Sequence, residues 1–182
     1  MHLKVKQTKN KKPKIFILDV DGVMTNGQFI YSTKGKIQKS FGADDHDGLS
    51  LIKEFMEVRF ITGDKKGFKI SKKRIVDDMN FELDLVSTVK RLDWINSKYK
   101  LNEVVYMGDG IMDIPVMTKV FYSICPSNGS ELTKKYSSYV TKRSGGDRAV
   151  AEACLHLLEK FFKKFNPTNI PKNKKFSGAW KS

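Results

Sequence analysis

The residues best suited to chemistry are two aspartates, Asp19 and Asp21, which stand two positions apart directly after a short apolar run. The run, residues 14–19, indicates a buried strand that ends at a glycine-containing turn. As the chain turns, two such carboxylates can converge on one site. One carboxylate can attack a substrate while the other donates and then accepts a proton. A solvated turn is the simpler alternative, because aspartate and glycine favour turns in any case.

A second acidic motif, Gly108–Asp113, follows another apolar run and contributes Asp109 and Asp113. If the two runs are neighbouring parallel strands, the carboxylates at their ends repel one another unless a cation neutralises them. Oxygen ligands of this kind suit Mg²⁺. Thr62 and Gly63 end a strand-like segment between the two motifs, where a hydroxyl and a glycine turn can donate hydrogen bonds to a phosphate. These residues predict a magnesium site beside a phosphate-binding turn.

The elements that must position these residues follow from an alternation of strand-like and helix-like apolar patterns. The expected strands cover residues 14–19, 58–61, 83–86, 103–107, 120–124 and 138–140. The expected helices cover residues 45–56, 66–79, 88–99, 114–118, 131–136 and 147–165. The alternation predicts an α/β fold with a doubly wound (Rossmann-like) parallel sheet, which binds ligands at the carboxyl ends of its strands.

A chain of 182 residues is expected to form one domain with small additions. The domain is predicted over residues 14–165, between a basic leader at 1–13 and a basic tail at 166–182 that lacks an apolar period. Within it, residues 27–41 carry two short β-prone segments, which predict a β-hairpin flap. No segment is long enough to form a large cap domain.

Composition narrows the possible functions. The net charge of +14 could indicate a polyanion partner, but the basic residues are mostly lysines spread along the chain, so we expect no specific nucleic acid. The apolar runs are too short to cross a membrane, and the leader lacks the apolar region of a signal peptide. We therefore expect a cytoplasmic protein without a membrane span. Cys125 and Cys154 lack CxxC spacing and indicate reduced thiols.

Together the motifs resemble the haloacid dehalogenase-like phosphohydrolases, in which an Asp-x-Asp pair precedes a Thr or Ser, a Lys and an acidic Gly-Asp-x-x-x-Asp. Their order and strand positions match from residue 14 to about residue 162. The segment DVDGVMTNGQFIY and the hairpin that follows it resemble the capless branch, which contains phosphatases of octulosonate and nonulosonate phosphates. The segment YVTKRSGGDRAVAEACLHLLEKF is similar to the C-terminal part of that branch.

The resemblance implies a role for each matching residue. Asp19 would be the nucleophile that forms an aspartyl-phosphate, and Asp21 would protonate the leaving sugar oxygen and then activate water. Mg²⁺ would be held by the Asp19 carboxylate, the backbone carbonyl of Asp21 and Asp109, while Asp113 would orient metal-bound water or share in binding. Thr62 would donate to the phosphoryl oxygens.

The lysine of the family pattern has more than one candidate. The family spacing, counted back from the acidic motif, falls near residues 87–90, where Lys90 supplies the only ammonium group. We choose Lys90 as the phosphate-stabilising lysine. Lys72 or Lys73, from the preceding helix, could reach the site instead, and Lys90 would then be an exposed helix residue.

Three further residues are expected to contact substrate, namely Thr25, Gly63 and Arg148. Arg148 follows two glycines at the start of the last helix, where free N–H groups favour an anion and the guanidinium suits a carboxylate or phosphate. The alternative is that Arg148 is a surface side chain beside a helix cap.

The segment Gly42–Gly48 departs from the octulosonate phosphatases, which carry an arginine there. Its acidic residues and His46 favour hydroxyl groups, an amine or a second cation over an unmodified octulosonate. Asp45 could instead cap the following helix.

We therefore predict a Mg²⁺-dependent phosphoric monoester hydrolase that acts on a small sugar phosphate. The alternative is a weakly active scaffold or regulatory partner of a nucleotide-sugar synthetase. An open, capless site must be covered to exclude water, and the hairpin is too small to be stable alone. We therefore expect hairpins to pack together in a homotetramer.

Overall fold

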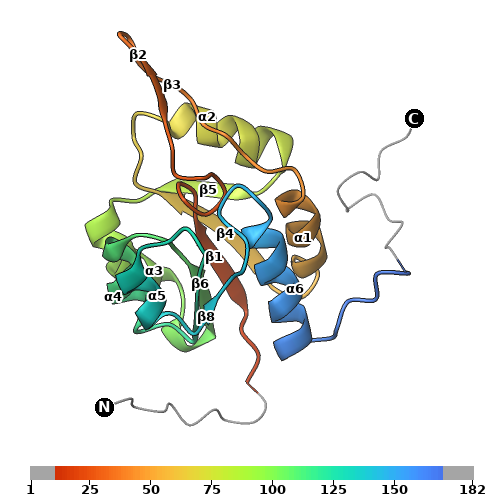
Figure 1. Ribbon diagram of the computed structural model, residues 1–182. Helices are drawn as coiled ribbons and strands as arrows, with labels where there is room; N and C mark the ends of the chain where they lie inside the picture. Colours follow the sequence, from red (N-terminus) through yellow and green to blue (C-terminus); the bar gives the residue numbers. More distant parts are fainter. Residues whose placement is uncertain (1–10, 170–182) are drawn as a thin grey trace.

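The computed structural model describes residues 11–169 of the chain (Figure 1). Most of the predicted basic leader and part of the predicted tail lie outside these residues. The described part contains a six-stranded sheet and a separate two-stranded hairpin. The predicted α/β fold with a flap and no large cap is confirmed.

All neighbours in the six-stranded sheet are parallel, in the order β5-β4-β1-β6-β7-β8. The central strand, β1, is buried along its whole length, as expected for an apolar strand covered on both faces. The strands are β1 (Ile15–Asp19), β4 (Glu57–Thr62), β5 (Glu82–Leu85), β6 (Val104–Met107), β7 (Tyr122–Cys125) and β8 (Tyr139–Val140). Because β1 lies between β4 and β6, the loops after these three strands meet at one edge of the sheet.

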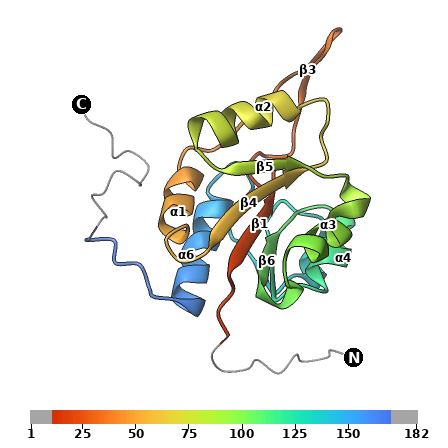
Figure 2. The ribbon, with the colours of Figure 1, turned by 180° about the vertical axis from the view of Figure 1, so that it is seen from behind.

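Helices cover both faces of the sheet, and Figures 1 and 2 show α1 and α6 on one side and α3 to α5 on the other. The predicted helix at 66–79 consists of α2 followed by the π-helix η1, and the predicted helix at 88–99 begins with the 3₁₀ turn η2. The α-helices are α1 (Asp45–Ile52), α2 (Phe68–Lys72), α3 (Arg91–Lys98), α4 (Ile114–Met117), α5 (Glu131–Tyr136) and α6 (Ala149–Phe161). The shorter turns are η1 (Lys73–Asp78), η2 (Thr88–Lys90), η3 (Leu101–Glu103) and η4 (Ile111–Asp113).

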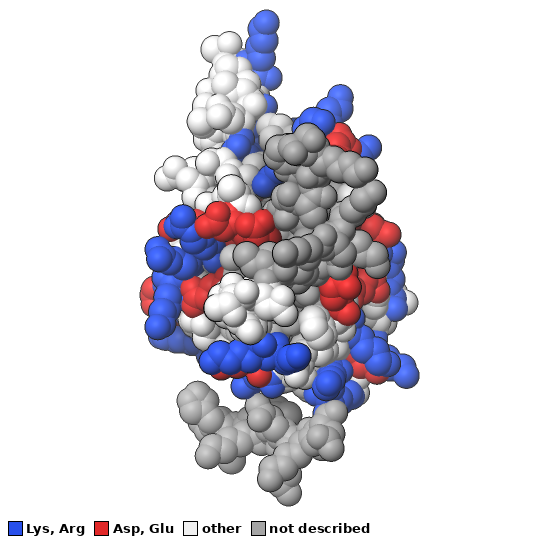
Figure 3. Space-filling model, turned by 90° about the vertical axis from the view of Figure 1, so that its right-hand side faces the viewer, with Lys and Arg blue, Asp and Glu red and all other residues white. Residues whose placement is uncertain are grey.

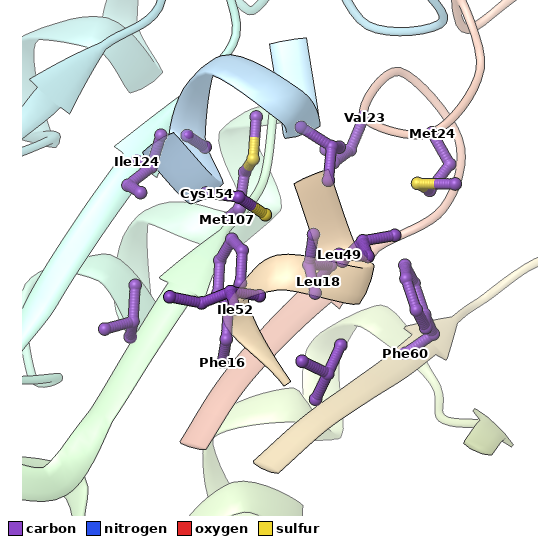
Figure 4. Close-up of a cluster of buried hydrophobic side chains, with 14 of the residues drawn as sticks. Phe16, Leu18, Val23, Met24, Leu49, Ile52, Phe60, Met107, Ile124 and Cys154 are labelled. Atoms are coloured by element: carbon purple, nitrogen blue, oxygen red, sulfur yellow. The ribbon is translucent and has the colours of Figure 1, made fainter. Parts of the chain in front are cut away.

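The larger core lies between the sheet, α1 and α6. Figure 4 shows its side chains, which include Phe16 and Leu18 from β1, Leu49 from α1 and Cys154 from α6. The two helices approach closely at Gly48, where a Cβ would lie 2.6 Å from the Cα of Ala151. The loop that precedes α6 lies against the loop after β1, where the N–H of Gly146 donates to the carbonyl of Val23 at 3.2 Å. Both cysteines are buried free thiols.

The hairpin consists of β2 (Ile30–Ser32) and β3 (Gly35–Gln38), paired antiparallel within the predicted 27–41 segment. It projects from the edge of the sheet where β1 ends, beside α2 (Figure 1). Its apolar side chains remain exposed, with Ile30 at 52%, Tyr31 at 58% and Ile37 at 55%. The flap therefore presents an apolar surface next to the site.

The surface seen in Figure 3 carries basic side chains interleaved with acidic ones. Among residues 11–169, no helix has both the length and the apolar character needed to cross a membrane.

Candidate active site

Three carboxylates converge at the carboxyl end of the sheet. Asp19 is the last residue of β1, and Asp109 and Asp113 follow β6, which pairs with β1. One carboxylate oxygen from each residue lies within 4.8 Å of the others. The loop after β1 can approach this closely because Gly22 has a φ of +84°, and a Cβ there would lie 2.1 Å from Asp109 Oδ2. The cluster offers the oxygen ligands that suit Mg²⁺.

Burial makes negative charge in this cluster unfavourable. The side chains of Asp19 and Asp113 are 9% and 2% exposed. Burial raises the pKa of Asp109 to about 6, and repulsion from Asp113 adds to the shift. Burial also raises the pKa of Asp19; Arg91 opposes that shift, whereas Asp113 and Asp109 add to it. A divalent cation would neutralise this repulsion, so the cluster fits a metal-binding role in both its donor atoms and its charge.

A buried arginine, Arg91, completes the cluster. Its Nη1 lies 2.8 Å from Asp19 Oδ2 and its Nη2 lies 2.9 Å from Asp19 Oδ1, so the guanidinium grips the carboxylate with two hydrogen bonds. Nη1 also contacts Asp113 and donates to the hydroxyl of Tyr106 at 3.1 Å. Sequence reasoning missed Arg91, although it stands next to the chosen lysine.

The three candidate lysines lie apart from the carboxylates. Lys90 ends η2 and is exposed, lining a surface hollow with Trp94. Lys72 and Lys73 are exposed, and the ammonium group of Lys73 lies 3.3 Å from Asp78. Within residues 11–169, none of these lysines forms an ion pair with the three clustered carboxylates.

On the other side of the site, Asp21 faces the flap. Lys39, directly after β3, places its Nζ 2.7 Å from Asp21 Oδ1 and 2.8 Å from Asp64 Oδ2. Thr62, the last residue of β4, donates from Oγ1 to Asp21 Oδ2 at 3.5 Å. The structure thus brings Asp21 and Thr62 together. It adds Lys39 and Asp64, which sequence reasoning did not assign to the site; Asp64 directly follows the Thr62–Gly63 motif, whereas nothing in the pattern marked Lys39.

The comparison with known sequences agrees with this geometry. The family described as haloacid dehalogenase-like hydrolase matches residues 63–153. The 3-deoxy-D-manno-octulosonate 8-phosphate phosphatase of Salmonella typhi is 32% identical over 161 residues, covering 83% of this chain and 82% of the relative. The chain belongs to the haloacid dehalogenase-like hydrolases. The enzyme of the same description from Escherichia coli strain K12 is 31% identical over 155 residues, covering 80% of this chain and 79% of the relative.

Solved structures of this hydrolase family match as well. The 3-deoxy-D-manno-octulosonate 8-phosphate phosphatase of Moraxella catarrhalis, in complex with magnesium ion, phosphate ion and KDO, superposes with a TM-score of 0.69 at 27% identity. The match covers 81% of this chain and 86% of that one. The enzyme of Yersinia pestis gives a TM-score of 0.68 at 28% identity and covers 81% of both chains. This hydrolase is therefore a capless phosphoric monoester hydrolase.

Two predicted substrate residues of the hydrolase hold loops in place. Thr25 is buried, and its Oγ1 accepts hydrogen bonds from the N–H groups of Gly22 and Gly27, each at 3.2 Å. Gly63 packs tightly, because a Cβ there would lie 2.9 Å from Thr88 Oγ1. Both residues border the loops that carry the carboxylates, so they shape the site.

Arg148 lies on the surface and not among the clustered carboxylates. Its guanidinium pairs with Asp44 and, at 3.1 Å, with Asp147. Asp45 is buried, and its Oδ1 accepts the N–H of Ala151 at 3.0 Å, near the start of α6. Asp45 therefore caps α6 and not the helix that it begins, which gives the acidic segment a structural role in joining α1 to α6.

Proposed function

We propose that this chain is a Mg²⁺-dependent phosphatase that hydrolyses a small sugar phosphate through an aspartyl-phosphate on Asp19. The observation that carries the proposal is the buried cluster of Asp19, Asp109 and Asp113, with which Arg91 alone among residues 11–169 forms ion pairs. Such a cluster requires a further cation, and its place at the strand ends is where this fold binds ligands. The relatives act on a sugar phosphate, which supports that substrate class here.

The first step would join Asp19 to the substrate. A carboxylate oxygen of Asp19 bonds to phosphorus while the bond from phosphorus to the sugar oxygen breaks, and Asp21 gives that oxygen its proton. Thr62 would donate a hydrogen bond to the phosphoryl oxygens. In the second step, water attacks phosphorus, Asp21 takes the proton from water, and phosphate leaves as Asp19 is restored. Asp21 can act in this way because Lys39 and Thr62 hold its carboxyl group in a fixed position.

Mg²⁺ would be held by Asp19, Asp109 and the backbone carbonyl of Asp21, with Asp113 in support. When bound, the metal supplies positive charge that offsets the phosphoryl oxygens as a carboxylate approaches them. The three carboxylates fit this role, because burial and mutual repulsion disfavour their negative charge, which a bound cation would offset.

We assign the phosphate-stabilising cation to Arg91 in place of Lys90. The guanidinium already binds both oxygens of Asp19, so a phosphoryl group attached to Asp19 would lie within its reach. Arginine suits phosphate because its donors form a planar fork. With Arg91 in the role of the family lysine, the site has every residue that the reaction needs, which favours the enzyme over the weakly active scaffold.

The proposal also includes a homotetramer in which flaps cover neighbouring sites. The apolar side chains of the hairpin, including Tyr31 and Ile37, are more than half exposed and need a partner surface. Sedimentation of the purified protein should show a tetramer at micromolar concentration. A monomer under those conditions would refute this part of the proposal.

Turnover of p-nitrophenyl phosphate with and without Mg²⁺ tests the function. We expect release of p-nitrophenol that depends on Mg²⁺ and stops when a chelator is added. A panel of sugar phosphates, assayed for released phosphate, then identifies the substrate. Absence of Mg²⁺-dependent turnover on every compound would overturn the proposal.

A further inference from the structure

The flap places a fully buried ammonium group inside the site. Lys39 stands directly after β3, and its side chain is 0% exposed. Besides Asp21 and Asp64, its Nζ lies 2.9 Å from the hydroxyl of Ser71 on α2. A buried lysine must be paired, because an isolated ammonium group in a protein interior is strongly unfavourable. Lys39 is therefore fixed between the loops after β1 and β4 and helix α2.

The contact with Asp21 involves both carboxyl oxygens. Nζ of Lys39 lies 2.7 Å from Oδ1 and 2.9 Å from Oδ2 of Asp21. The Asp21 side chain is still 18% exposed, so solvent and substrate can reach it. Lys39 thus limits the rotation of the carboxyl group while part of the Asp21 side chain stays exposed.

A second flap lysine, Lys36, lies in the same part of the site but does not contact Asp21. Lys36 contacts Asp64, and its Nζ lies 3.2 Å from the centre of the Phe29 ring. Burial would raise the pKa of Asp64, but hydrogen bonds from Lys36 and Lys39 lower it to about 2. Asp64 therefore stays ionised and anchors both lysines of the flap.

We propose that Lys39 is a positioning residue for proton transfer by Asp21, and that it makes this transfer depend on the flap. The inference rests on the proposed function. When the bond from phosphorus to the leaving oxygen breaks, the proton of the Asp21 carboxyl group moves to that oxygen, and Lys39 transfers nothing. Its role is to hold the carboxyl group in the geometry that the transfer requires.

Leaving groups of different basicity test this role. A sugar or glycerol oxygen needs a proton as it departs, whereas p-nitrophenolate leaves readily without one. We expect Lys39→Met to lower kcat/KM for glycerol 3-phosphate and phenyl phosphate roughly tenfold or more beyond its effect on p-nitrophenyl phosphate. The value of kcat/KM reports only the steps up to departure of the leaving group, so later attack by water does not enter. The ratio between substrates is also independent of how much variant is folded.

Lys36→Met is the matched control, because it removes a buried flap lysine of the same kind that does not contact Asp21. It should change kcat/KM for all three substrates by the same factor. In an Asp21→Asn background, Lys39→Met should no longer alter the ratio, because its target is gone. An equal loss on all substrates in Lys39→Met alone would overturn the proposal. If Asp21→Asn itself left the ratio unchanged, the acid role of Asp21 in the proposed function would fail, which is a different result.

Discussion

Around Asp19 one guanidinium pairs with two of three clustered carboxylates, whereas around Asp21 two carboxylates share two buried ammonium groups. The acidic half of the site consists of Asp19, Asp109, Asp113 and Arg91, and the flap half consists of Asp21, Asp64, Lys36 and Lys39. The carboxylates of the acidic half lie at or just after the ends of the buried strands β1 and β6, and Arg91 is the first residue of α3. The flap half depends on a hairpin whose apolar face is exposed.

The difference separates two tasks. The acidic half carries a surplus of negative charge that a divalent cation and Arg91 must balance before a phosphate can approach. The flap half is charge-balanced by its own residues, so it can order the acid and base without a metal. We expect substitutions in the acidic half to abolish reaction or metal binding, and those in the flap half to change the response to the leaving group.

The largest expected effect is that of Asp19→Asn. The amide is nearly the same size as the carboxylate but cannot attack phosphorus, so turnover of p-nitrophenyl phosphate should fall by at least about 10³-fold. Circular dichroism should show an intact fold. Activity within tenfold of the unmodified enzyme would remove Asp19 as the nucleophile.

Arg91→Ala should have the next largest effect on activity. It removes the fork that binds Asp19 and leaves Asp113 and Asp19 without their cation, so kcat/KM should fall roughly 10²-fold. Lys90→Ala is the matched control, and its activity should stay within about twofold because Lys90 lies on the surface. Steady-state kinetics on p-nitrophenyl phosphate measure both. If Lys90→Ala lowered kcat/KM strongly and Arg91→Ala did not, the phosphate-stabilising role would belong to Lys90.

Metal binding should weaken as pH falls. Burial raises the pKa of Asp109 to about 6 and that of Asp19 to about 7, so protons compete with Mg²⁺ below about pH 7. This competition weakens Mg²⁺ binding roughly tenfold per pH unit for each proton displaced. Without metal, the pH dependence of protein stability that comes from these carboxyl groups has the opposite sign. Carboxyl groups whose folded pKa exceeds the unfolded value stabilise the protein at low pH, and this contribution is lost as pH rises from about 4 to about 7.

Thermal unfolding at pH 5 and pH 8, over a range of Mg²⁺ concentrations, tests this expectation. Mg²⁺ should raise Tm more at pH 8 than at pH 5, and Asp109→Ala should remove most of the increase. The same Mg²⁺ response at both pH values would contradict the placement of the metal among these carboxylates.

The smallest expected effect is that of Arg148→Ala. If Arg148 contacts the sugar, KM for the true sugar phosphate should rise severalfold while p-nitrophenyl phosphate is unaffected, because the artificial substrate lacks distal groups. The pairing of Arg148 with Asp44 supports the competing structural role. Equal effects on the two substrates, or none on either, would leave Arg148 as a structural residue.

Sequence patterns located the parts of the site that depend on strand order. Asp19, Asp109 and Thr62 each end or follow a buried apolar strand, and parallel strands bring their carboxyl ends to one edge. The same reasoning could not separate Lys90 from Arg91 as the cation of the site, because the two residues carry the same charge and are adjacent. One residue along a helix changes the direction of a side chain by about 100°. Lys90 is the last residue of η2 and is exposed, whereas Arg91 is the first residue of α3 and is buried.

Lys39 was even harder to predict from the sequence than Arg91. On a short exposed hairpin a lysine is expected to face water, and nothing in its neighbours marks it as buried. By itself, the sequence determined the order of strands and helices, the flap and the carboxylates, because apolar periodicity and turn residues act locally. Only the tertiary structure decided which cations meet them. Ion pairs between residues 18 and 72 positions apart depend on how the flap and α3 pack against the sheet, and short-range patterns do not contain that information.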